Sequence, residues 1–365
     1  MQMFTLTFIR SRIHYILALL PKLSLRRIYT IIVALVSYLF KRDRSSIVPP
    51  LLIVNLTFRC NYSCIMCMKN APGDNPYKNP KSIDFETFSR LLRENGRCLS
   101  LVRLHGGEPL FYKEIDPLID LMNKHRIPYS IITNGYLLTP AVCEKIVGRC
   151  VGVSLSIDAA DPVVYKTMRR GGDIGTVTEN IRYLEELKRA RRSKTPILNI
   201  SSVFFSFNMA ELPKLVRYSS ENGIGSLSAG EGWFYDTPFI REEEFLSHHP
   251  DLVRSSIEEA RTLADELGVI LRLKFPSLKS RGSGEKTPVR KATGNIRSCM
   301  NLYVSAELHP DLSVIACCDA KAPFGSLADA GLRDIWNGPG YIDARRKLRN
   351  HEIPEACRGC MSLYS

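Results

Sequence analysis

Cys60, Cys64 and Cys67 stand within eight residues of one another, at spacings of four and three. Thiolates are soft ligands that favour iron–sulfur clusters or zinc. A cubane cluster takes four ligands, so three thiols would leave one iron open to a ligand from outside the protein. The apolar run 51–57 comes just before and predicts a buried strand. The cysteines then fall in the loop at that strand's C-terminal end, where α/β barrels carry their chemistry.

Two structural interpretations of these cysteines remain open. Their spacing is also that of one helix face, which would make them buried thiols, although Asn61 and Ser63 beside a strand end favour a loop. A zinc site would require a fourth protein ligand, and residues 68–70 offer none. A disulfide is disfavoured in a chain of intracellular character.

The segment from 51 to about 275 alternates strand and helix patterns. The predicted strands are 51–57, 99–104, 129–133, 151–157, 197–204 and 225–230, and the predicted helices are 84–95, 113–125, 139–148, 176–192, 209–222 and 251–267. Such alternation indicates parallel βα units. Six units are too few for a closed eight-stranded barrel. The sequence therefore predicts an α/β fold that carries the cysteine loop on its first strand.

The pattern CxxxCxxC after a first strand resembles the radical S-adenosylmethionine (radical SAM) superfamily. The resemblance implies a partial (β/α)6 TIM-like barrel over 51–280 and a [4Fe–4S] cluster on Cys60, Cys64 and Cys67, with SAM chelated to the open iron. One electron from the cluster would cleave SAM to methionine and a 5′-deoxyadenosyl radical, which abstracts hydrogen from the substrate. The family usually has an aromatic residue just before the third cysteine, where this chain has Met66.

The resemblance also assigns SAM contacts to the ends of the following strands. A GGEP segment binds the amino group of SAM, a TNG segment recurs after the third strand, and an S-x-D strand reaches the ribose and carboxylate. An arginine pairs with that carboxylate, a geometry that guanidinium suits. The cofactor-binding residues implied here are Gly106, Gly107, Glu108, Asn134, Ser156, Asp158 and Arg169.

Each of these motifs taken alone also fits a structural role. The two glycines can form an ordinary turn, Asp158 can cap the helix that starts near Asp161, and Arg170 carries the same charge as Arg169. The catalytic residue is unknown. Glu231, at the top of the sixth predicted strand, is the weak candidate for a substrate contact, and its alternative is a residue of a packing loop.

A second cysteine set follows a predicted basic linker over 279–297. A hairpin pattern with strands at 302–306 and 312–316 and a basic helix through 348 lie between its members, which are Cys299, Cys317, Cys357 and Cys360. This order resembles the SPASM/twitch domain of radical SAM enzymes. The resemblance implies a small α+β domain over 281–365 that holds one auxiliary [4Fe–4S] cluster without an open iron. Four cysteines ending in C-x2-C would also suit zinc.

The N-terminal segment is both basic and apolar. Residues 1–50 contain eight Lys or Arg and one acidic residue, a net +7 of the chain's +13. Their apolar stretches, 13–20 and 28–40, are too short to span a bilayer, and no signal-peptide cleavage site follows them. The sequence predicts a helical segment that lies on an anionic membrane surface through residues 1–45, or that packs on the barrel and covers its open side.

These patterns predict a cytoplasmic enzyme, which is peripheral on the membrane if residues 1–45 lie on an anionic membrane surface. Hydrophobic residues are 45 % and charged residues 24 % of the chain, as in ordinary globular proteins. The resemblance implies an oxidoreductase or maturase with SAM, two [4Fe–4S] clusters and a one-electron reductant such as flavodoxin or ferredoxin. Its substrate is a peptide, a lipid-linked molecule or a small molecule, and we expect no nucleic-acid partner. The contrasting hypothesis is a non-catalytic iron–sulfur electron carrier or scaffold, which would have no use for the SAM contacts.

Overall fold

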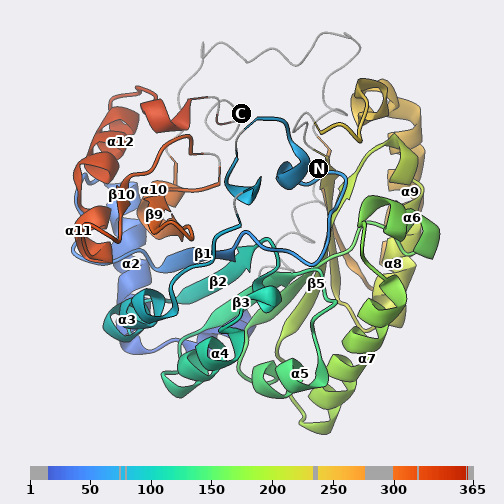
Figure 1. Cartoon of the computed structure of the whole chain (residues 1–365), viewed down its shortest axis with the longest axis horizontal. Coiled ribbons are helices and arrows are strands. Elements are labelled where there is room, and N and C mark those ends of the chain that lie inside the picture. Colours follow the sequence, from blue (N-terminus) through green and yellow to red (C-terminus); the bar gives the residue numbers. More distant parts are fainter. Residues whose placement is uncertain are drawn as a thin grey trace.

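One mixed sheet organises the protein. The structure is a computed structural model that describes residues 15–73, 75–78, 80–232, 237–275, 299–318, 320–358 and 360. Within these residues the sheet has ten strands in the order β10-β9-β8-β1-β2-β3-β4-β5-β6-β7. Helices cover its outer face, while the loop that carries the first three cysteines lies in front of the strand ends (Figure 1).

Parallel strands and their helices form the barrel part of the sheet. The strands are β1 (Leu51–Thr57), β2 (Leu101–Gly106), β3 (Tyr129–Thr133), β4 (Gly152–Ser156), β5 (Ile197–Phe204), β6 (Ser226–Glu231) and β7 (Ile270–Lys274). The helices are α3 (Phe85–Asn95), α4 (Ile115–Lys124), α5 (Pro140–Ile146), α6 (Pro162–Met168), α7 (Ile174–Ala190), α8 (Glu211–Glu221) and α9 (Pro250–Leu267). All six predicted strands and all six predicted helices are confirmed. In this part of the sheet β7 is an additional strand, which pairs with β6.

The two faces of the barrel sheet differ in polarity. Leu52, Val54 and Leu56 alternate along β1 and are fully buried in the core, as expected for a strand covered by helices on one face. The opposite face carries hydrogen-bonding side chains. Asn199 of β5 is an example, since its amide contacts Ser154 at 3.2 Å and its carbonyl oxygen accepts from Ser226 at 2.9 Å. The face turned away from the helices is therefore polar, and the Tyr15 ring packs against it at Gly152 of β4.

The C-terminal part extends the same sheet. It contains α10 (Asn301–Val304), β8 (Ser305–Leu308), β9 (Ser313–Ile315), β10 (Gly325–Ser326), α11 (Leu332–Trp336) and α12 (Pro339–Arg349). The predicted hairpin exists as β8 and β9, which are antiparallel, and β8 pairs in parallel with β1. The prediction of a strand from 302 was wrong at its start, because residues 301–304 form α10 and the strand begins at Ser305. The predicted linker over 279–297 lies outside the described residues, so the boundary between 280 and 281 stays a prediction.

Helix α2 (Leu25–Leu39) packs at the N-terminal ends of the barrel strands. Arg27 Nε and Nη2 donate to the carbonyl oxygens of Leu99 and Gly96, both at 2.9 Å, just before β2. Lys22 Nζ donates to Gly148 O, ahead of β4, at 2.8 Å. The segment thus covers the end of the barrel opposite the cysteine loop rather than its open side. Of the helices described, none has the length and apolar character needed to cross a membrane.

Candidate functional site

The first cysteine set lies on a loop directly after β1. The residues between Cys60 and Cys67 form no helix, which removes the interpretation of three thiols on one helix face. Two backbone bonds tie the loop to the end of α6: Ser63 N donates to Arg170 O at 2.8 Å, and Ile65 N donates to Met168 O at 2.9 Å. The loop is therefore held in place by the protein itself.

Burial governs the electrostatics of these thiols. Burial, together with the smaller effects of the charges of Glu108 and the other two thiols, raises the pKa of Cys60 to about 12. Burial likewise raises the pKa of Cys64 to about 11, although the Arg169 guanidinium counteracts the shift. Ligand thiolates must lose their protons to bind metal, so cluster binding is coupled to proton release here.

The Gly106-Gly107 segment packs its backbone against the start of the cysteine loop. Gly107 N donates to Thr57 O at 2.7 Å, and a Cβ on Gly107 would lie 2.2 Å from Arg59 O. Gly106 has φ +134°, which an L side chain rarely adopts. Only glycine allows this approach, so the segment has a backbone cradle beside Cys60.

Glu108 joins the ends of β2 and β3. Its side chain is 1 % exposed and accepts from Thr133 Oγ1 at 2.7 Å, Asn134 N at 2.8 Å and Leu110 N at 3.1 Å. Asn134 Nδ2 in turn donates to Asn61 Oδ1 at 2.8 Å. This chain of bonds connects the predicted SAM contacts at 106–108 and 134 to the cysteine loop.

Glu108 should make stability depend on pH. Burial raises its pKa from 4.5 to about 7, so the group stabilises the fold fully below about pH 4.5 and loses that contribution as the pH rises through about 7. Relative to Glu108→Gln, the wild type should lose about 3 kcal/mol of unfolding free energy across this window. Urea unfolding at a series of pH values measures the difference. Glu179→Gln, at an exposed carboxyl, is the control, and parallel profiles of wild type and Glu108→Gln would refute the assignment.

Asp158 and Arg169 form a buried ion pair. Arg169 Nη2 lies 2.7 Å from Asp158 Oδ2, and Asp158 Oδ1 accepts from Val203 N at 2.9 Å. Burial raises the pKa of Asp158, and the charge of Arg169 opposes this shift. Asp158 does not cap α6, because Asp161 occupies that position.

The neighbouring arginines are separated by their surroundings. Arg169 Nη1 lies 3.9 Å from Cys64 Sγ, whereas Arg170 is exposed and stacks on the ring of Phe239 at 4.0 Å. The structure thus brings Arg169 rather than Arg170 to the cysteine loop. Ser156 ends β4 beside Ser201 and is half-buried.

The residues at this loop fit a [4Fe–4S] cluster that carries SAM. Three thiols of one loop are available to three irons, and the glycine segment lies beside them. Asn61 Nδ2 and Arg169 Nε are buried without a hydrogen-bond partner among the described residues. Such orphaned donors are costly unless a ligand uses them, and a carboxylate would satisfy them.

The cysteines of the second set lie in loops and turns of the C-terminal part. Burial, together with the smaller effects of the nearby charges of Cys299 and Cys360, raises the pKa of Cys357 to about 12. Cys360 N donates to Cys357 O at 3.2 Å. Cys317 follows β9 and lies close enough to Tyr341 to influence its pKa. Cys299, Cys357 and Cys360 thus lie near one another, and the place of Cys317 as the fourth ligand stays a prediction.

A polar cluster beside the site was not predicted. Glu307 of β8 accepts from Asn55 Nδ2 at 2.8 Å and lies 3.2 Å from His309 Nε2 and 3.6 Å from His105 Nε2. His105 directly precedes the glycine pair, which is the only signal in the sequence. Glu307 reaches it through the pairing of β8 with β1, which spans about 250 residues of chain.

Glu231, the weak catalytic candidate, ends β6 and is half-buried. Its position at a C-terminal strand end suits a substrate contact. Residues 233–236, which follow it, lie outside the described residues. Its role stays a prediction.

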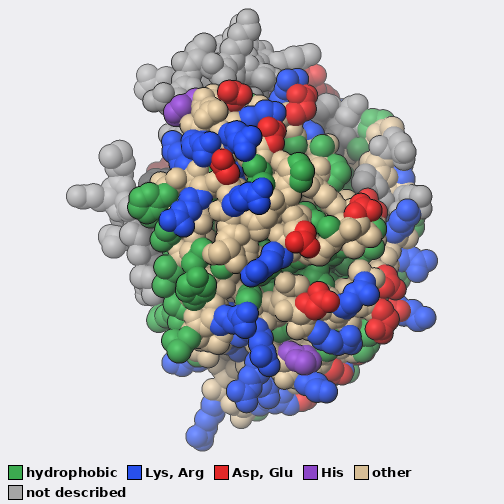
Figure 2. Space-filling model, turned by 90° about the vertical axis from the view of Figure 1, so that its left-hand side faces the viewer, with side chains coloured by type: hydrophobic (Ala, Val, Ile, Leu, Met, Phe, Trp, Pro, Cys, Tyr) green, Lys and Arg blue, Asp and Glu red, His purple; other side chains and the backbone are tan. Residues whose placement is uncertain are grey.

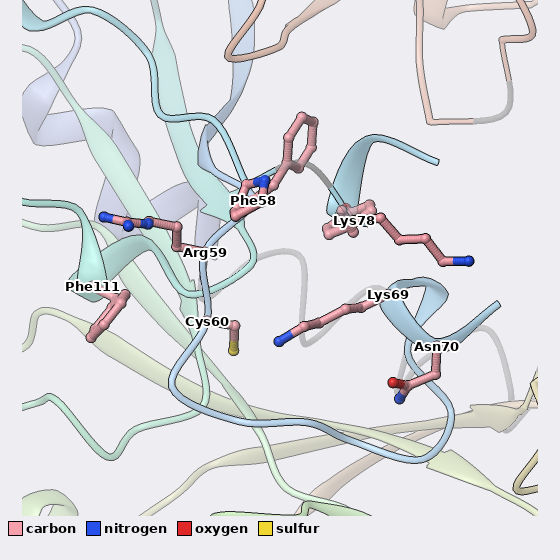
Figure 3. A pocket seen from close by; sticks show the side chains of 9 residues that line it. Phe58, Arg59, Cys60, Lys69, Asn70, Lys78 and Phe111 are labelled. Carbon is pink, nitrogen blue, oxygen red and sulfur yellow. The ribbon is translucent and has the colours of Figure 1, made fainter. Parts of the chain in front are cut away.

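A cavity of about 540 Å³ opens beside Cys60, within the usual range for ligand pockets. Figure 3 shows the Cys60 sulfur at this cavity and the Lys69 amino group pointing toward it. The lining residues are Phe58, Arg59, Cys60, Lys69, Asn70, Tyr77, Lys78, Pro80 and Phe111. The cavity is therefore cationic and reaches one of the predicted cluster ligands.

Comparisons with known proteins agree with this geometry. Residues 54–218 match the family model described as the radical SAM superfamily, and residues 299–361 match SPASM, an iron-sulfur cluster-binding domain. A PqqA peptide cyclase of Granulibacter bethesdensis is 25% identical over 326 residues, which cover 87% of this chain and 81% of that protein. A GTP 3',8-cyclase of Clostridium botulinum is 27% identical over 218 residues, which cover 57% of this chain and 66% of that protein.

Solved structures show the same fold. SuiB of Streptococcus suis bound to S-adenosylmethionine has a TM-score of 0.62 and 18% identity, covering 85% of this chain and 70% of that chain. SuiB bound to the precursor peptide SuiA has a TM-score of 0.61, with 85% of this chain and 69% of that chain covered.

The cofactors follow from both matched families: SAM, a SAM-binding [4Fe–4S] cluster and auxiliary iron–sulfur binding in the C-terminal part. When bound, they supply the electron that splits SAM and the radical that abstracts hydrogen. The predicted catalytic class is confirmed over the electron-carrier alternative, since the matched relatives are enzymes. The chain belongs to the radical SAM superfamily and carries a C-terminal SPASM domain.

Proposed function

We propose that this radical SAM enzyme abstracts hydrogen from a peptide, as the first step of a cross-linking, cyclisation or oxidation of that peptide. The observation that carries this proposal is the extent of similarity. The peptide cyclase aligns with 87% of this chain, whereas the nucleotide cyclase aligns with 57%. SuiB, which shares the fold, has been solved with a precursor peptide.

The polar face of the sheet supports a peptide. Asn199 Oδ1 lies 2.9 Å from Ser226 Oγ, 3.2 Å from Ser228 Oγ and 2.5 Å from Arg272 Nη2. A peptide presents a donor and an acceptor at almost every residue, and this face offers both kinds of group. We propose Glu231, at the top of the neighbouring β6, as a substrate contact.

The cavity beside Cys60 supports an acidic one-electron reductant, such as a flavodoxin or a ferredoxin. Arg59, Lys69 and Lys78 line it, and complementary charge speeds the encounter of such partners. Electron delivery at this side would leave the polar face of the sheet to the substrate.

We place the reaction in the cytoplasm. All eleven cysteines are free thiols in the structure, and reduced thiols persist in cytosolic compartments. A cluster that depends on three thiolates in one loop needs that environment.

Deuterium transfer tests the peptide proposal. The probe is a deuterated synthetic peptide copied from a short reading frame beside the gene, incubated anaerobically with reconstituted enzyme, SAM and dithionite. We expect deuterium in the released 5′-deoxyadenosine, measured by mass spectrometry. Cys143→Ala, at a buried thiol in α5, should transfer as well as the wild type. The proposal would be overturned if 5′-deoxyadenosine acquired deuterium from labelled GTP and not from any such peptide.

A further inference from the structure

Helix α2 is amphipathic, but it buries its polar and small side chains and exposes its large apolar ones. Arg27, Thr30, Ala34 and Ser37 are buried against the protein. The large apolar side chains point outward instead, at spacings of three and four that align them on one side of a helix. We call them the apolar stripe: Leu25, Ile28, Tyr29, Ile32, Leu35 and Leu39.

The reversal follows from how the helix is attached. Arg27 donates to the carbonyl oxygens of Leu99 and Gly96, and Ser100 Oγ donates to Arg27 O at 3.3 Å. These bonds hold the polar face against the barrel. A helix whose only task was to cover the barrel would bury its apolar face, so the stripe is left for another surface.

The exposed apolar area is concentrated here. Of the nineteen large hydrophobic side chains exposed in the described residues, ten lie between 16 and 40. Leu25 is 87 % exposed and Leu39 71 %. Figure 2 shows hydrophobic side chains gathered along the left edge of the molecule in that view, with Lys and Arg side chains bordering them. Contiguous apolar patches of this kind mark interaction sites.

The charges around the stripe are of one sign. Arg26 lies exposed near its start, and Arg42 and Arg44 lie exposed beyond its end. The only acidic residue of the segment, Asp43, is paired with Arg349 of α12 at 2.7 Å. An apolar stripe with cations at both ends matches an anionic lipid surface, where each cation adds to the attraction.

A second copy of the chain fits this surface less well. A two-fold dimer would place the same patch against itself, and the cations of one copy would then face those of the other. Helix α2, with its fifteen residues, is about 22 Å long, short of the roughly 30 Å of a bilayer core. We propose that α2 lies in the plane of an anionic membrane surface and anchors the enzyme there.

The anchoring sets the orientation of the active site. The residues that hold α2 precede β2 and β4, whereas Cys60 follows the opposite end of β1. The cysteine loop therefore faces away from the lipid, toward the aqueous side. A lipid-linked substrate drawn from the bilayer beneath α2 does not reach this site, whereas a water-borne substrate does. The anchoring itself does not depend on the identity of the substrate.

Vesicle binding tests the proposal with the full chain. The probes are vesicles of phosphatidylcholine alone and of phosphatidylcholine mixed with phosphatidylglycerol, and sedimentation gives the partition coefficient. Wild type should bind the mixed vesicles and be partly released by salt. Leu25→Glu, Ile32→Glu and Leu39→Glu together should lower the coefficient at least about a hundredfold, since each apolar contact is lost. Arg26→Gln, Arg42→Gln and Arg44→Gln together should weaken binding to mixed vesicles only.

The matched control changes exposed apolar residues elsewhere. Val163→Glu, Leu252→Glu and Leu267→Glu together alter exposed apolar side chains on other helices and should bind as wild type does. The cluster absorbance of each variant reports that it is folded. Equal binding by the stripe variant and the control would overturn the proposal. A wild type that does not bind mixed vesicles would also overturn it. If the wild type were then a dimer and the stripe variant a monomer, the stripe would be the interface with a second copy.

Discussion

The protein with Cys60, Cys64 and Cys67 all changed to Ala is expected to release no 5′-deoxyadenosine from SAM and dithionite. Its iron content should fall from about eight to about four atoms per chain, since one of two cubane clusters is lost. The reason is geometric, because the loop after β1 supplies only these three thiols. Iron assays on anaerobically reconstituted protein and chromatography of the products measure both effects.

The matched control changes three of the four cysteines that lie outside both sets. Cys143 and Cys150 belong to the packed core of the barrel and Cys98 packs against it, so the change of all three to Ala should leave iron content and SAM cleavage near wild type. Complete loss of iron from the loop variant, or zinc in the C-terminal part of protein isolated without oxygen, would refute the assignment of two clusters.

Arg169→Met is expected to lower SAM cleavage at least about a hundredfold and to cost about 3–5 kcal/mol of stability. The pair with Asp158 is buried, and loss of the guanidinium strands a carboxylate with no solvent contact. The same change removes the cation nearest Cys64 Sγ. Turnover rates and thermal unfolding of the reconstituted enzyme separate the two effects.

Arg170→Met is the control for this prediction. Arg170 has the same charge one residue away but stacks on Phe239 at the surface, so its loss should change stability by less than about 1 kcal/mol. Adding Asp158→Asn to Arg169→Met should restore part of the stability, because the stranded charge is gone, while SAM cleavage stays low. Equal effects of Arg169→Met and Arg170→Met would contradict the assigned role.

Local sequence determined most of the barrel. Buried strands such as β1 are short apolar runs, and helices such as α3 and α5 begin at the side-chain caps Asp84 and Thr139, so their patterns are visible within a few residues. The cysteine spacing and the glycine pair at 106 are equally local, because one loop or turn holds each set. Their chemistry could therefore be predicted before any contact was known.

The tertiary structure decided which of two adjacent arginines lies beside the cysteine loop. Arg169 and Arg170 are indistinguishable in sequence, and only the fold buries one beside Asp158. Glu307 joins His105 because β8 pairs with β1, a long-range contact with no local signature.

The orientation of α2 depends on the same kind of contact. Its apolar periodicity predicts an amphipathic helix, but periodicity alone does not say which face is buried. Arg27 decides this by donating to carbonyl oxygens about seventy residues away. The sequence by itself thus determined the elements of the barrel and the candidate ligands in the loop after β1, since both are encoded within a few neighbouring residues. The partners of Arg169, Glu307 and α2 were decided only by the packing of distant segments.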